Sequence, residues 1–160
     1  MDECRPRTLV ELLERSAEEF GTRKAVSMKA GLRTRSLNYA ELAAAMVAVA
    51  GDLATRQDLA RGDRVMILAP NGIDTVAALF GLWRAGLVAV PLDVNSTPVF
   101  VQAVGRQTEA RLIIGPPSLA EGLGFDVMDP GRIFSGGTTA PPQHRTRFMW
   151  AARAFSRSER

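Results

Sequence analysis

The 160-residue sequence has few cysteines, histidines and lysines and no long apolar run. One cysteine, Cys4, excludes an intrachain disulfide. The one histidine, His144, has no Cys or acidic cluster beside it in the sequence, so we interpret it as an exposed linker residue and assign no metal or catalytic role. No apolar stretch approaches the ~20 residues of a membrane helix, and the start MDECRPR lacks a signal-peptide core. We therefore expect a cytoplasmic protein without a membrane partner.

Positive charge is concentrated near the end of the sequence. Residues 1–131 contain 14 Lys or Arg and 16 Asp or Glu, whereas residues 132–160 contain six Arg and one Glu. This basic tail leaves two interpretations open, a segment that binds nucleic acid or a poorly ordered tail. We favour the second, because the arginines are scattered and no nucleic-acid-binding motif accompanies them.

Two helices that flank a hairpin are indicated in the first part of the chain. Apolar residues in 8–20 recur at helical spacing, Thr8 and Glu11 fit a capping box, and Gly21 suits a left-handed residue after the helix. Two short strands with a turn at Ala30-Gly31 predict a surface hairpin.

The second helix is expected from about residue 39 to residue 59. Asn38 and Glu41 repeat the start signal of a capping box. One side of this helix is apolar and is expected to be buried, and it consists of Leu42, Met46, Val49 and Leu53.

The middle of the chain predicts a parallel sheet. Continuous apolar runs are typical of strands that are buried on both faces, and here they alternate with helical patterns. Val65–Ile114 therefore reads as βαβαβ, with strands at 65–69, 87–92 and 111–114 and helices at 74–85 and from Thr97. For the last helix we expect Phe100, Val101 and Val104 to face the sheet.

Three residues near these strands have both a structural and a functional interpretation. Asp93 follows a strand end, where open α/β sheets bind ligands, and Asp63 precedes a strand. We interpret both as turn-forming or capping residues. Trp83 is interpreted as part of the core and not as a stacking surface for a ligand.

Five segments, in this order and spacing, resemble the adenylate-forming (AMP-binding) ligases of the acyl-CoA and aryl-CoA synthetase type. They are TLVELLERSAEEF, SLNYAELAAAMVAVAGDLA, GDRVMILAPN, FGLWRAGLVAVPLDVN and VGRQTEARLII, within residues 8–115. The resemblance implies an incomplete N-terminal subdomain of a larger ligase fold. It also implies a family that uses ATP, Mg²⁺ and CoA, with the catalytic groups in later segments.

The stretch FSGGTTAPPQHR is the one place where a phosphate loop of this family can be sought. The family loop runs Ser-Gly-Thr-Thr-Gly, one variable residue, then Pro-Lys-Gly, and Gly137, Thr138 and Thr139 match it. Gln143 stands where the family has lysine, and Ala140 replaces a glycine. Because glycines aim the amides and lysine supplies the charge at a phosphate, we interpret the stretch as a linker.

The sequence thus predicts a partial ligase-like α/β domain over 1–115 and a Pro/Gly-rich linker and poorly ordered basic tail over 116–160. We expect no catalysis by this chain alone, no cofactor of its own, and self-association or pairing with the remainder of a ligase. Two alternatives stay open, a standalone α/β module that binds a nucleotide or a partner and an interaction protein that acts through its basic tail. The acid substrate is not indicated.

Overall fold

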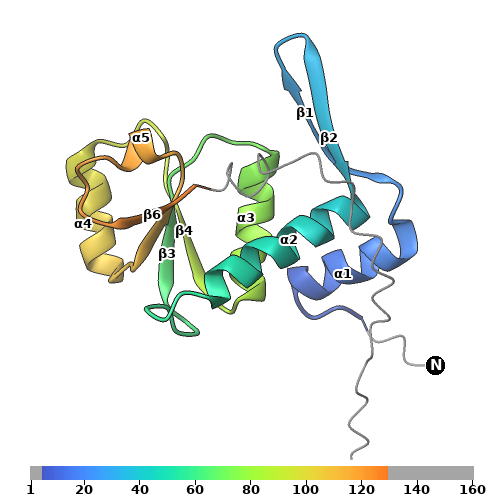
Figure 1. The fold of residues 1–160 in the computed structure, drawn as a ribbon, viewed down its shortest axis with the longest axis horizontal. Coiled ribbons are helices and arrows are strands. Elements are labelled where there is room, and N and C mark those ends of the chain that lie inside the picture. The colour runs from blue at the N-terminus through green and yellow to red at the C-terminus, as the bar shows by residue number, and fades with distance from the viewer. Residues whose placement is uncertain (1–4, 130–160) are drawn as a thin grey trace, which may run out of the picture.

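The computed structural model describes residues 5–129 and has the expected α/β architecture (Figure 1). Two helices and a hairpin come first, and a four-stranded parallel sheet with its helices follows. In chain order the elements are α1 (Leu9–Phe20), β1 (Lys24–Ala30), β2 (Arg33–Asn38), α2 (Tyr39–Ala54), β3 (Arg64–Ile67), α3 (Ile73–Arg84), β4 (Val88–Pro91), α4 (Pro98–Thr108), β5 (Leu112–Ile114), α5 (Pro117–Ala120) and β6 (Asp126–Met128).

Helix α1 begins where the sequence predicts, but its first turn is capped differently. The Thr8 hydroxyl accepts a hydrogen bond from the Glu11 amide at 3.1 Å, as expected. The Glu11 carboxylate accepts from the Arg7 amide at 2.7 Å, where a capping box would use the amide of Thr8. The prediction of a left-handed Gly21 is wrong. Gly21 stays right-handed at φ −44°, and its carbonyl accepts from the Ala40 amide, which ties the end of α1 to the start of α2.

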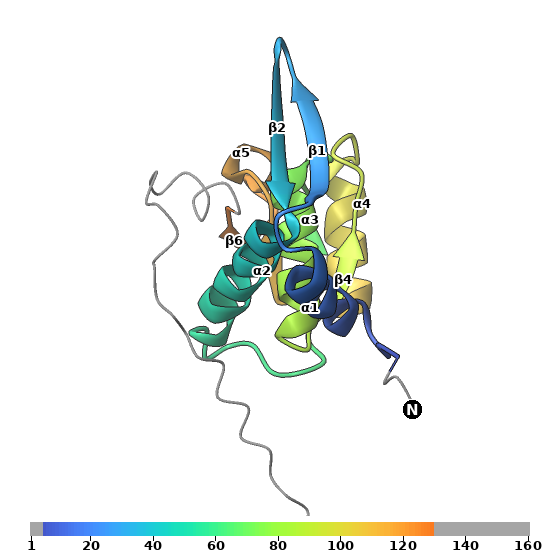
Figure 2. The ribbon, with the colours of Figure 1, turned by 90° about the vertical axis from the view of Figure 1, so that its right-hand side faces the viewer.

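The hairpin of β1 and β2 is confirmed. Ala30 pairs with Arg33 across a two-residue loop, Gly31-Leu32, so the turn lies one residue later than predicted. Gly31 has φ 61°, a left-handed conformation that glycine adopts without a steric cost. Figures 1 and 2 show that the hairpin projects from the body of the molecule.

Helix α2 starts with the predicted capping box. The Glu41 amide donates to the Asn38 side chain and the Asn38 amide donates to the Glu41 carboxylate, both at 2.8 Å. The helix ends at Ala54, before the predicted end near residue 59, where the Thr55 hydroxyl donates to the Asp52 carbonyl at 2.7 Å. The predicted buried side is confirmed, and it comprises Leu42, Met46, Val49 and Leu53.

All four strands of the sheet run parallel, in the order β4-β3-β5-β6. The central strands β3 and β5 are buried almost throughout, as their continuous apolar runs predict. The prediction that residues 87–92 form a strand buried on both faces is wrong for β4. Within residues 5–129, β4 pairs with β3 on one side only, and 46% of Val88 is exposed. An apolar run therefore predicts that a strand forms, but it does not predict whether that strand is central or at the edge of the sheet.

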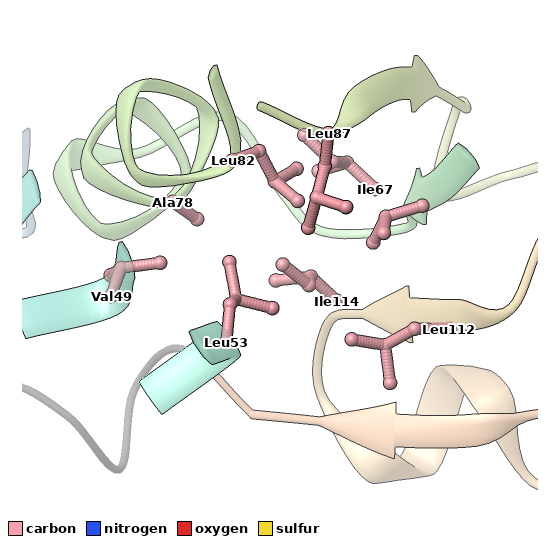
Figure 3. Close-up of a cluster of buried hydrophobic side chains, with 9 residues drawn as sticks. Val49, Leu53, Ile67, Ala78, Leu82, Leu87, Leu112 and Ile114 are labelled. Carbon is pink, nitrogen blue, oxygen red and sulfur yellow. The ribbon is translucent and has the colours of Figure 1, made fainter. Parts of the chain in front are cut away.

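The two faces of the sheet are covered by different helices. Side chains of α2 and α3 pack on one face, where Val49, Leu53 and Leu82 point toward the strands (Figure 3). The other face is covered by α4 and α5, through Val101 and Ala120. The chain is thus doubly wound around β3 and β5.

One prediction for α4 fails. Val101 is buried and Val104 is half-buried, but 53% of Phe100 is exposed. Thr97 caps the helix, its hydroxyl accepting from the Phe100 amide at 3.3 Å, so Phe100 lies in the first turn, where its side chain is partly open to solvent.

The sheet continues past residue 115, where the sequence analysis placed the start of a linker. β6 pairs with β5, and Phe125 packs into the cluster formed by β5, α4 and α5. A β-carbon at Gly105 of α4 would lie 2.3 Å from the Phe125 ring. The ring can therefore pack this closely on α4 only because residue 105 has no side chain. None of the helices in residues 5–129 has both the length and the apolar character to cross a bilayer.

Candidate functional site at the carboxyl edge of the sheet

The geometry of the sheet singles out the carboxyl ends of the neighbouring strands β3 and β5. From β3 the chain passes into α3 on one face, and from β5 it passes into α5 on the other face. In open α/β sheets the loops part at such a point, and ligands bind outside the strand ends there. This edge is therefore the candidate site that the fold itself defines.

Backbone contacts join the segments that follow these strands. The Leu68 amide donates to the Ile114 carbonyl at 2.9 Å, and the Gly115 amide donates to the Met128 carbonyl at 3.0 Å. A β-carbon at Gly115 would lie 2.0 Å from the Leu68 carbonyl oxygen. Only glycine allows this approach, so the segments that follow β3 and β5 are in direct contact. A ligand at this edge would therefore lie outside the contact between Leu68 and Gly115.

Two polar side chains near the edge, Thr75 and Asp74, form contacts within the protein. The Thr75 hydroxyl donates to the Pro70 carbonyl at 2.7 Å and thereby closes the β3–α3 loop. Asp74, in the first turn of α3, forms an ion pair with Arg35 of the hairpin at 2.8 Å. The hairpin is thus held against the loop that follows β3.

Asp93 and Asp63 act as the turn residues that the sequence predicts. The Asp93 carboxylate accepts from the amide and from the side chain of Asn95, at 2.7 and 2.9 Å. The Asp63 carboxylate accepts from the Ala60 amide at 2.8 Å, before β3 and so at the other end of the sheet.

The other candidates from the sequence are not brought to this edge by the described structure. Gly137, Thr138 and Thr139, the candidate phosphate loop, lie outside the described residues, as does His144. In residues 5–129 no group of three or more His, Cys, Asp or Glu side chains is placed to hold a metal ion. A nucleoside triphosphate with Mg²⁺ is held in proteins by cations and carboxylates.

A hollow that the sequence analysis missed lies at the amino end of β4, away from the carboxyl edge. It has a volume of about 490 Å³ between the start of α1 and the turn from α3 to β4. Its lining includes Leu9, Glu11 and Trp83. Trp83 is half-buried, its ring makes an edge-to-face contact with the Phe80 ring at 5.5 Å, and it lines this hollow. It is not among the residues of the buried clusters of residues 5–129, so the prediction that it belongs to the core is not borne out. No signal in the sequence could have paired segments so far apart.

Comparison with known proteins identifies the family. A family model described as AMP-binding enzyme matches residues 13–132. The chain belongs to the AMP-binding enzyme family. The resemblance in the sequence to adenylate-forming ligases is thereby confirmed.

Curated relatives are about one-third identical to the chain over the matched segments. Fatty acid–[acyl-carrier-protein] ligase MmaC of Mycobacterium marinum is 34% identical over 120 residues, which cover 70% of this chain and 22% of that protein. A 3-hydroxybenzoate–CoA ligase of Aromatoleum is 31% identical over 106 residues, which cover 64% and 20%. The chain spans only 14–22% of the length of the curated relatives it matches, which supports a fragment of a ligase.

Solved AMP-binding structures share the fold. A fatty acyl-adenylate ligase of Legionella pneumophila, solved with acyl adenylate and pyrophosphate, superposes with a TM-score of 0.73 at 18% identity, over 81% of this chain and 24% of that chain. The N-terminal subdomain of NpsA from Klebsiella oxytoca superposes with a TM-score of 0.70 at 22% identity, over 87% and 34%. The α/β sheet described above therefore has the fold seen in these structures.

Proposed function

We propose that this chain forms the first structural segment of an ATP-dependent ligase that joins a carboxylic acid to a thiol through an acyl-adenylate, and that it does not catalyse this reaction alone. One observation carries the proposal. The family match takes up most of the chain, residues 13–132, but the matches cover only 14–22% of the length of curated relatives.

The geometry of the carboxyl edge supports a scaffold role. Asp74 pairs with Arg35 through Oδ2, and Asp93 holds its own turn through Oδ1, so both carboxylates already have a structural role. The Leu68–Gly115 contact fixes the strand ends rigidly. In this proposal the chain provides one wall of the site, and the groups that contact ATP, Mg²⁺ and CoA belong to other segments of the ligase.

The substitutions in the candidate phosphate loop fit the same proposal. Gln143 carries a neutral amide where the family has the lysine ammonium, and Ala140 replaces a glycine that frees the backbone. A loop with less charge and fewer permitted backbone conformations binds triphosphate weakly. The named substrates of relatives, fatty acids and 3-hydroxybenzoate, suggest a fatty or aryl carboxylic acid for the complete ligase.

The test is exchange of labelled pyrophosphate into ATP, measured with the purified chain and a panel of fatty and aryl acids. We expect no acid-dependent exchange, while a full-length relative in the same assay supplies the positive control. Acid-dependent exchange by the chain alone would overturn the proposal.

A restored loop separates two causes of inactivity. A variant with Gly136→Ser, Ala140→Gly, Gln143→Lys and His144→Gly regains the family loop sequence. We expect it to remain inactive, because segments beyond this loop are also required. If exchange appeared, the loop alone would be limiting and the scaffold proposal would be wrong. Saturable ATP binding by the unaltered chain, followed by tryptophan fluorescence, would favour the standalone nucleotide-binding module instead.

A further inference from the structure

The hairpin formed by β1 and β2 carries a charge opposite to that of the rest of the described chain. Residues 22–38, here called the basic hairpin, contain five Lys or Arg and no Asp or Glu. The remainder of residues 5–129 contains nine Lys or Arg and 14 Asp or Glu. Figures 1 and 2 show the distal part of the basic hairpin projecting beyond the helices and the sheet. The basic hairpin is therefore a projecting, positively charged arm on a body whose net charge is negative.

The base of the arm is fixed to the body. Arg35 and Asp74 form their ion pair at 2.8 Å, and a β-carbon at Gly72 would be 3.5 Å from the Met28 methyl carbon. Both contacts join the basic hairpin to the loop and first turn that follow β3. The tip beyond these contacts is therefore held at a defined distance from the body.

The tip combines one apolar side chain with two cations. Leu32 lies in the two-residue loop and is fully exposed. Arg33 pairs with Ala30, and Lys29 pairs with Thr34. Because successive side chains of a strand alternate between faces, Lys29 and Arg33 project from opposite faces of the ribbon. Within the described part of the chain, neither cation forms an ion pair.

We propose that the basic hairpin docks end-on to an anionic lipid surface. Leu32 enters the boundary between headgroups and acyl chains, and Lys29 and Arg33 contact lipid phosphates on either side of it. Cations on both faces suit a flat and laterally extended anionic surface, whereas a protein groove that held one face would leave one cation unused. The acidic body is repelled by the same surface, which favours the end-on orientation.

Two other classes of partner fit less well. Residues 22–38 contain no aromatic residue, so the basic hairpin has no side chain on which the bases of single-stranded nucleic acid could stack. An acidic protein surface would satisfy the charges but would not explain a leucine presented alone at the tip. The earlier expectation of no membrane partner rested on the lack of a spanning segment, and contact at a lipid surface is a different mode of binding.

The first test is co-sedimentation of the full chain with phosphatidylglycerol–phosphatidylcholine vesicles and with pure phosphatidylcholine vesicles. We expect binding to the anionic vesicles only. The double variant Lys29→Gln/Arg33→Gln should weaken it by about 5-fold for each charge removed. The control Arg106→Gln/Arg111→Gln removes the same charge from exposed positions away from the basic hairpin, and should bind as the unaltered chain does. Equal losses in both double variants would overturn the proposal.

A probe at the tip distinguishes docking of the basic hairpin from adsorption through residues 132–160. A polarity-sensitive thiol dye is attached to Thr34→Cys in a Cys4→Ser background, with Val99→Cys as the control position because Val99 is 73% exposed on α4. We expect the dye at position 34 to brighten and shift to the blue on anionic vesicles, and the dye at position 99 to stay unchanged. Leu32→Ser should reduce the shift. Vesicle binding without any change at position 34 would overturn the proposal, as would binding of an acidic protein but not of vesicles.

Discussion

Gly81 of α3 packs directly against Val49 of α2. A β-carbon at position 81 would lie 2.4 Å from Val49 Cγ1 and 3.2 Å from the Met46 carbonyl oxygen. The two helices approach so closely because this position has no side chain. The contact couples the N-terminal part of the chain to the sheet, since Val49 also belongs to the cluster that packs on β3 and β5.

Substitution of this glycine tests the close packing. We expect Gly81→Ala to lower the free energy of unfolding by about 1–3 kcal/mol, because the added methyl group overpacks the α2–α3 contact. Urea unfolding followed by circular dichroism measures the loss. Gly51→Ala is the matched control, since Gly51 lies in α2 with nothing within 4 Å of the new methyl group. It should stabilise the chain by about 0.5–1 kcal/mol, and a loss as large as that of Gly81→Ala would contradict this account.

The capping box of α2 gives a second prediction. Asn38→Ala removes the acceptor of the Glu41 amide, so the free energy of unfolding should fall by about 1 kcal/mol. Asn38→Gly should cost only about 0.3 kcal/mol, because glycine tolerates the cap conformation and leaves the amide open to water. The two variants are compared by their urea midpoints, and equal costs would show that the side-chain bond contributes nothing.

The ion pair between the basic hairpin and α3 should contribute little to stability. The Arg35 and Asp74 side chains are 46% and 31% exposed, so a double-mutant cycle of Arg35→Gln and Asp74→Asn should give a coupling of about 0.2–1 kcal/mol. The coupling should shrink in about 1 M salt, where exposed charges are screened. A cycle of Lys24→Gln with Asp74→Asn is the control and should give no coupling. A coupling that persists in high salt would argue against an exposed pair.

The exposed edge of β4 gives a prediction on self-association. Val88 is 46% exposed on a strand that pairs on one side only within residues 5–129, and such edges pair with other chains. We expect the purified chain to self-associate and Val88→Lys to reduce this in analytical ultracentrifugation. Val47→Lys is the control, because Val47 is 47% exposed but lies on α2. If both variants reduced association equally, general surface hydrophobicity and not the strand edge would be responsible.

The sequence was sufficient for most individual elements. Caps such as Asn38 with Glu41, and Thr97 before Pro98, depend on residues within one helical turn, so their spacing is visible in the sequence. The continuous apolar run at Val65 likewise predicts a buried strand without reference to the rest of the chain. The family resemblance depends on the order of such local segments.

The candidate site was predicted only in general terms. An α/β sheet implies a ligand-binding edge, and Asp93 was correctly interpreted as a turn residue. The pairing of Asp74 with Arg35 could not be foreseen from the sequence. The two residues are far apart in the chain, and only the packing of the hairpin beside the start of α3 brings them together. The phosphate-loop interpretation of Gly137 to Thr139 stays a prediction.

Thus the amino-acid sequence by itself determined the α/β class, the positions of most helices and strands, and the family, because these follow from periodicity, caps and segment order. The tertiary structure alone decided that β4 is an edge strand, that Gly115 meets the Leu68 carbonyl, and that Gly81 meets Val49. The physical reason is that edge position and close backbone approach are set by which distant segments pack together. The sequence of a glycine or of an apolar run does not reveal whether a distant segment of the chain packs against it.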